Sequence, residues 1–150
     1  MWRSLIRERK NLPMLSDAAV KELLQRANTI AVVGLSDSPD RPSYMIAQFL
    51  QQQGYRIIPV NPNLSGTVLG EQPYARLSEI AEPIDIVNVF RRSNHLAGVV
   101  EEAVVCGAGA LWAQPGVYDQ AAVTRAQAAG LPIVTNRCIA VEYRRHGVRR

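Results

Sequence analysis

The residues best suited to bind a ligand lie in one loop, at positions 34–43. Gly34 follows a short apolar run, and the loop also carries polar side chains that bind anions, at Ser36, Arg41 and Ser43. We expect Ser43 to cap a helix over residues 44–53, whose free N–H groups and positive dipole end would face the loop. This combination favours a phosphate group, while the alternative interpretation is a plain connection between a strand and a helix.

The glycine pattern of the loop argues against a dinucleotide such as NAD. The Rossmann fingerprint G-x-G-x-x-G needs three glycines, but no glycine follows Gly34 until Gly54. The next strand ends at Asn61, where an NAD-binding unit usually carries an acidic residue that holds the ribose hydroxyls. Because Asn61 is neutral, it does not repel a phosphate on the ribose.

Predicted strands and helices alternate along the chain and must position these residues. We expect strands over 29–33, 55–60, 83–90, 108–113 and 131–134. Helices are expected after Ser16 or Asp17, over 44–53, after Ser93, and after Asp119. The pattern predicts an α/β fold, with a doubly wound, five-stranded parallel sheet of Rossmann-like topology and strand order 3-2-1-4-5.

In such a sheet the ligand binds at the carboxyl ends of the strands, where the strand order reverses. With the predicted order this point lies between the first and fourth strands. The segments expected to meet there are the loop 34–43, Asn61-Pro62, Phe90-Arg91 and Gln114-Pro115-Gly116. Their joint placement favours a nucleotide-type ligand.

In the third strand, Asp85 is expected to mark an exposed start and Asn88 to make a side-chain hydrogen bond.

Composition predicts one soluble domain. The chain has 150 residues, of which 47% are hydrophobic and 20% charged, with no apolar run that suits a signal peptide or a membrane span. We therefore expect a cytoplasmic protein with no membrane partner. The net charge of +4 comes from residues 1–10 and 141–150, which carry +3 each and leave −2 for the body.

The basic residues thus indicate two solvated terminal arms, 1–10 and 144–150, and no nucleic-acid partner is expected. Binding of RNA or of a protein through these arms is the alternative.

The two cysteines, Cys106 and Cys138, form no C-x-x-C pair and have no histidine at zinc-ligand spacing, so no metal is expected. We expect both to be reduced thiols and Cys138 not to be a nucleophile.

Several segments together resemble the small CoA-binding proteins, whose single Rossmann-like domain is similar to the N-terminal domain of the succinyl-CoA synthetase α subunit. They are Val33-Gly34-Leu35-Ser36, Pro39, Arg41-Pro42-Ser43-Tyr44, Pro59-Val60-Asn61-Pro62, Leu69-Gly70-Glu71, Val89-Phe90-Arg91-Arg92 and Trp112-Ala113-Gln114-Pro115-Gly116. The resemblance covers residues 18–146, and the combination is more specific than any one segment. It departs from the family at Pro115, which replaces the usual leucine of a Gln-Leu-Gly turn.

The resemblance implies coenzyme A as the cofactor. Its phosphates would lie at Gly34, Leu35, Ser36, Arg41, Ser43 and Tyr44. Its adenosine would be bordered by Asn61 and Pro62, and its pantetheine would pass Phe90, Arg91, Gln114 and Gly116.

The residues show no catalytic constellation of the Ser-His-Asp or paired-carboxylate kind, so we expect no enzyme activity. The prediction is a stand-alone binding module for coenzyme A or acyl-CoA. The alternatives are an NAD(P)-dependent oxidoreductase and a nucleotide-binding regulatory protein.

Overall fold

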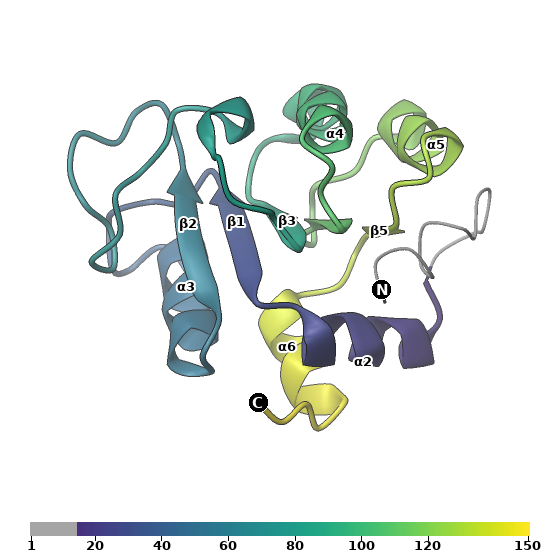
Figure 1. Cartoon of the computed structure of the whole chain (residues 1–150), viewed down its shortest axis with the longest axis horizontal. Coiled ribbons are helices and arrows are strands. Elements are labelled where there is room, and N and C mark those ends of the chain that lie inside the picture. The colour runs from purple at the N-terminus through teal and green to yellow at the C-terminus, as the bar shows by residue number, and fades with distance from the viewer. Residues whose placement is uncertain (1–14) are drawn as a thin grey trace.

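The computed structural model describes residues 15–150, and its centre is a five-stranded sheet between two layers of helices (Figure 1). All neighbouring strands are parallel, which confirms the predicted α/β fold. The strands are β1 (Thr29–Val33), β2 (Arg56–Val60), β3 (Ile86–Val89), β4 (Ala110–Ala113) and β5 (Ile133–Val134). Nearly every strand residue is buried, as both faces of the sheet are covered.

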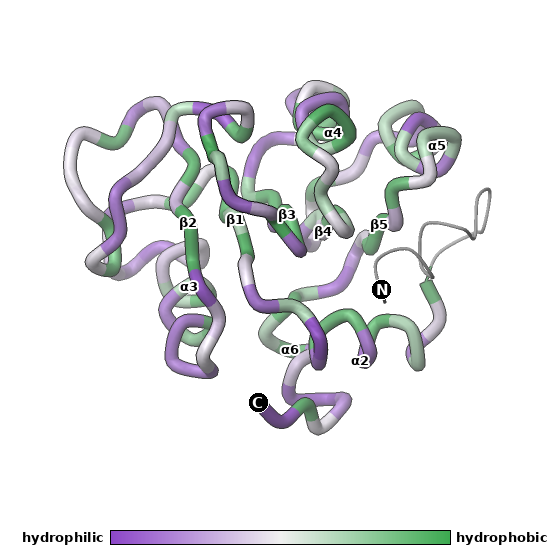
Figure 2. The backbone as a smooth tube through the Cα atoms, viewed as in Figure 1, coloured by the Kyte–Doolittle hydropathy of each residue, from purple (hydrophilic) through white to green (hydrophobic). Residues whose placement is uncertain are grey.

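Each face of the sheet carries its own hydrophobic cluster. One face is covered by α2 (Asp17–Arg26), α3 (Pro42–Gln52) and α6 (Ile139–Arg145). The other is covered by the 3-10 helix η1 (Leu77–Glu79), by α4 (Leu96–Val105), which follows η2 (Ser93–His95), and by α5 (Gln120–Ala128). Figure 2 shows the strands as mainly hydrophobic segments between these layers. Among the described helices, none is long and apolar enough to span a membrane.

The strand order is β2-β1-β3-β4-β5, so the predicted order 3-2-1-4-5 was wrong. The third strand pairs with β1 and does not lie outside β2. The connection from β2 to β3 contains η1, which packs on the face of the sheet opposite α3. A right-handed crossover on that face moves the chain across the sheet in the direction opposite to the crossover from β1 to β2 through α3. The direction therefore reverses between β1 and β3, which is where a ligand is expected.

The start of β3 also differs from the prediction. Asp85 is 5% exposed, and its Oδ2 accepts hydrogen bonds from the backbone N–H groups of Asn28 (2.8 Å) and Thr29 (2.9 Å). This carboxylate ties β3 to the start of β1, so the expected exposed start was wrong. Asn88 is fully buried, and its amide has no hydrogen-bond partner among the described residues, contrary to the predicted side-chain bond.

The C-terminal residues contact the domain and do not extend away from it, although the four arginines of the predicted arm 144–150 are exposed. Helix α6 was not predicted, and after it Val148 is buried. The guanidinium of Arg144 lies 4.2 Å from the ring centroid of Phe49, and that of Arg150 lies 4.0 Å from the ring of Tyr55. The faces of these two aromatic rings attract the guanidinium cations, so both arginines contact the folded domain. The predicted N-terminal arm, 1–10, lies outside the described residues.

Candidate functional site

Gly34 brings the loop after β1 into close contact with the end of β3. Its φ of 87° lies in the left-handed region that favours glycine, and a Cβ there would lie 2.6 Å from the carbonyl oxygen of Phe90. The Gly34 N–H donates to the Val60 carbonyl at 2.8 Å, and the Phe90 N–H donates to the Val33 carbonyl at 2.8 Å. The ends of β1, β2 and β3 therefore meet at a position that a larger residue would not fit.

Ser43 shapes the loop and does not cap the helix, so the predicted cap was wrong. Helix α3 begins at Pro42, with Arg41 as the N-cap residue and no side-chain cap. Proline favours the first helical position because its φ is already helical and it needs no hydrogen-bond acceptor. Ser43 is buried within the first turn, where its Oγ accepts the Ser36 N–H at 3.0 Å. Ser36 Oγ in turn accepts the Ser38 N–H at 3.1 Å.

The side-chain amide of Asn61 joins the loops that follow β1 and β2. Its Nδ2 donates to the Leu35 carbonyl at 3.1 Å, and its Oδ1 accepts the Asn63 N–H at 3.0 Å. Asn61 thus holds the shape of the site as well as lining it. Of the other predicted loop residues, Leu35 is fully buried and Tyr44 packs against the hydrophobic cluster beneath α3.

A cleft of about 570 Å³ opens at the carboxyl ends of β1 and β3. It collects these residues of the predicted site: Gly34, Ser36, Arg41, Ser43, Asn61, Phe90 and Arg91. The cleft is also lined by Asp37 and Pro42, which belong to the predicted loop 34–43, and by Asn63, Leu64 and Arg92, which the prediction missed. Most of these are neighbours of predicted residues, so widening each segment by one or two positions would have found them.

The cleft carries a surplus of positive charge. Three guanidiniums line it, from Arg41, Arg91 and Arg92, against the single carboxylate of Asp37. Within residues 15–150, the structure shows no ion pair to any of the three arginines. Their charge is therefore available to an anionic ligand, next to the positive end of the α3 dipole.

The predicted residues after β4 do not reach this cleft. Gln114 is buried, and its Oε1 accepts the Ile139 N–H at 3.1 Å, which holds the start of α6. Gly116 lines a separate hollow of about 360 Å³ next to β4 and β5. Pro62 lines a third pocket, which adjoins the cleft.

The predicted cap at Ser93 was also wrong. The Ser93 hydroxyl accepts the Tyr118 N–H at 2.9 Å and donates to the Gly116 carbonyl at 3.2 Å. It therefore joins the loops after β3 and β4 and does not satisfy the helix start. The predicted caps at Ser16 and Asp119 are confirmed, since each side chain accepts backbone N–H groups of the helix that follows.

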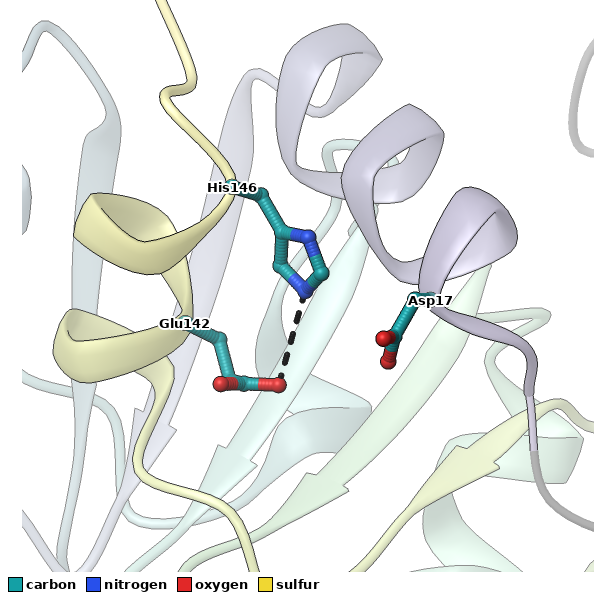
Figure 3. A group of neighbouring side chains, drawn as sticks. All are labelled: Asp17, Glu142 and His146. Atoms are coloured by element: carbon teal, nitrogen blue, oxygen red, sulfur yellow. Dashed lines mark ion pairs between the residues drawn. The ribbon is translucent and has the colours of Figure 1, made fainter.

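Asp17, Glu142 and His146 form a group whose ligand atoms lie within 4.8 Å of one another (Figure 3). Asp17 comes from α2 and faces the other two, which lie in α6 and directly after it. Arg137 and Arg145 already bind both carboxylates, at 2.9 and 3.0 Å from Asp17 and at 3.0 and 3.1 Å from Glu142. Two guanidiniums at these oxygens would repel a cation, so the group is an ion-pair network that joins α2 to α6.

This network predicts a pH dependence of stability. The guanidiniums of Arg145 and Arg137 hold the pKa of the Asp17 carboxyl below its usual value. The ion pairs of Asp17 stabilise the fold at pH values above the pKa that this carboxyl has in the unfolded chain. This stabilisation is lost as the pH falls through the lowered pKa of the folded state. Asp17→Asn should therefore lower the melting temperature at about pH 6, and the difference from the parent protein should shrink as the pH falls below the usual pKa of an aspartate. Thermal unfolding across this range tests the prediction, and an Asp40→Asn variant in an exposed loop is the control.

A family model described as a CoA binding domain matches residues 28–144. The uncharacterized protein YneT of Bacillus subtilis is 47% identical over 128 residues, which are 85% of this chain and 94% of YneT.

Two solved structures are similar in both sequence and fold. A structure titled cell-free ID.343, from Thermus thermophilus, is 35% identical with a TM-score of 0.84, over 88% of this chain and 99% of that one. A hypothetical protein from Pyrococcus horikoshii is 36% identical with a TM-score of 0.84, over 87% of this chain and 92% of that one.

Proposed function

Because the chain belongs to the CoA-binding domain family, we propose that it is a stand-alone module that binds coenzyme A or an acyl-CoA. The observation that carries the proposal is the cleft beside Gly34. Three arginines line this cleft, at the point where the loop after β1 contacts the end of β3. The diphosphate of CoA would lie there, at the N-terminus of α3, and receive charge-assisted hydrogen bonds.

Two features favour CoA over NAD. The loop lacks the second and third glycines of the dinucleotide fingerprint, and the strand β2 is followed by neutral Asn61 in place of a carboxylate. Coenzyme A carries a phosphate on its ribose, which an acidic residue at this position would repel. We propose that the protein holds its ligand without transforming it, with both cysteines as reduced thiols.

Calorimetric titration with CoA, NAD and NADP tests the proposal. We expect CoA to bind and the two nicotinamide dinucleotides to bind at least ten times more weakly. A ratio of about ten in affinity corresponds to the loss of one hydrogen bond to a charged group. Equal or tighter binding of NAD would contradict the proposal and support the oxidoreductase alternative.

Arg41 is the most direct probe of the phosphate site. Arg41→Ala should weaken CoA binding by about ten- to a hundred-fold, because a hydrogen bond to a charged group contributes about 1.5–3 kcal/mol. The measurement is calorimetry of the purified variant. Arg26→Ala is the matched control, since Arg26 lies on α2 and pairs with Glu22 at the surface. An Arg41→Ala variant with unchanged affinity would place Arg41 outside the phosphate site.

A further inference from the structure

A smaller pocket of about 230 Å³ adjoins the cleft, and Arg91 lines both. Four buried aliphatic side chains form its floor, from Val33, Val60, Leu77 and Val99. Exposed residues form its rim, among them Pro62, Arg76 and His95. Val33 and Val60 end β1 and β2, while Leu77 and Val99 belong to η1 and α4. The pocket therefore offers an aliphatic floor beside the phosphate site.

One buried polar atom of this pocket has no hydrogen-bond partner among the described residues. Glu102 lines the pocket from α4, and its Oε1 is buried and accepts no hydrogen bond from the described residues. Arg76, Arg91 and His95 also line the pocket, yet none of them donates to this oxygen. A buried acceptor without a donor destabilises a fold, so the structure leaves a place for a donor supplied by a ligand.

A pocket with an aliphatic floor and one unpaired buried acceptor fits a flat ring that carries an amino group. We infer that this pocket holds the adenine ring of CoA and that Glu102 Oε1 accepts a hydrogen bond from its 6-amino group. The inference rests on the proposed function and deepens it by assigning Glu102 as a residue that selects a 6-aminopurine. A 6-oxopurine would place a carbonyl oxygen against the carboxylate, where the two acceptors repel each other.

Calorimetry with CoA and with its hypoxanthine analogue, in which a carbonyl replaces the amino group, tests the inference. For the parent protein we expect CoA to bind about ten- to a hundred-fold more tightly than the analogue. If CoA does not bind, the proposed function fails. If both ligands bind equally well, the proposed function stands and the inference fails.

Variants of Glu102 separate recognition from a structural role. Glu102→Leu should weaken CoA binding by about ten- to a hundred-fold and abolish the preference over the analogue. Glu102→Gln should keep CoA binding through its amide oxygen and reduce the preference, because the turned amide donates to the carbonyl of the analogue. Because Oε1 is unpaired, Glu102→Leu should not lower the melting temperature. Glu101→Leu is the matched control, since Glu101 is exposed on the same helix and pairs with Arg125. A Glu102→Leu variant that unfolds at lower temperature, or that keeps the full preference for CoA, would overturn the inference.

Discussion

Replacement of Asp85 by alanine is expected to lower the free energy of unfolding by about 2–4 kcal/mol. The carboxylate is buried at the start of β3 and accepts two backbone N–H groups, from Asn28 and Thr29. Alanine would leave both donors without this acceptor, at the point where β1 begins. For a chain of this length the loss corresponds to a melting temperature lower by about 5–15 °C.

Urea and thermal unfolding of two further variants identify the cause. Asp85→Asn keeps an acceptor oxygen but not the charge, so its loss of stability should be smaller than that of Asp85→Ala. Asp40→Ala removes an exposed carboxylate from the loop after β1 and should change stability by less than about 0.5 kcal/mol. Equal stability of Asp85→Ala and the parent would show that the two backbone bonds do not hold the sheet together.

The second large effect is expected at Gly34, where alanine should reduce CoA affinity by more than about a hundred-fold. A Cβ would lie 2.6 Å from the Phe90 carbonyl oxygen, so the loop and the end of β3 must move apart. That movement changes the distance between Arg41 and Arg91, two of the three arginines that line the proposed phosphate site. Binding is measured by calorimetry, and folding of the variant is checked by circular dichroism.

Gly54→Ala is the matched control for Gly34→Ala. Gly54 has a similar φ of 96°, but nothing lies within 4 Å of the position of its Cβ. Both variants therefore carry the strain of a left-handed residue, about 1–2 kcal/mol, and only Gly34→Ala carries the clash. If both lose CoA affinity equally, the close approach of the strand ends is not what forms the site.

The local sequence around the cleft was sufficient to predict much of the site. Gly34 and Arg91 follow directly after apolar runs, Arg41 lies in the loop that begins at Gly34, and parallel strands bring their carboxyl ends to one edge. Strands and caps such as Ser16 and Asp119 could be predicted because they depend on neighbours within three or four residues. The cap at Ser43 was misplaced by two residues, since Pro42 determines where α3 begins.

The tertiary structure alone decided features that depend on partners far apart in the chain. The apolar run of β3 is compatible with a place on either side of β1, and only the face on which η1 packs determines its position. Gln114 is an ordinary turn residue in the sequence, but the fold brings Ile139 to its side-chain oxygen. Arg144 and Arg150 indicate a solvated arm by charge, because a sequence does not reveal that Phe49 and Tyr55 will lie beneath them. Contacts of this kind arise when whole layers pack, and the energy that selects them belongs to the assembled core and not to any local segment.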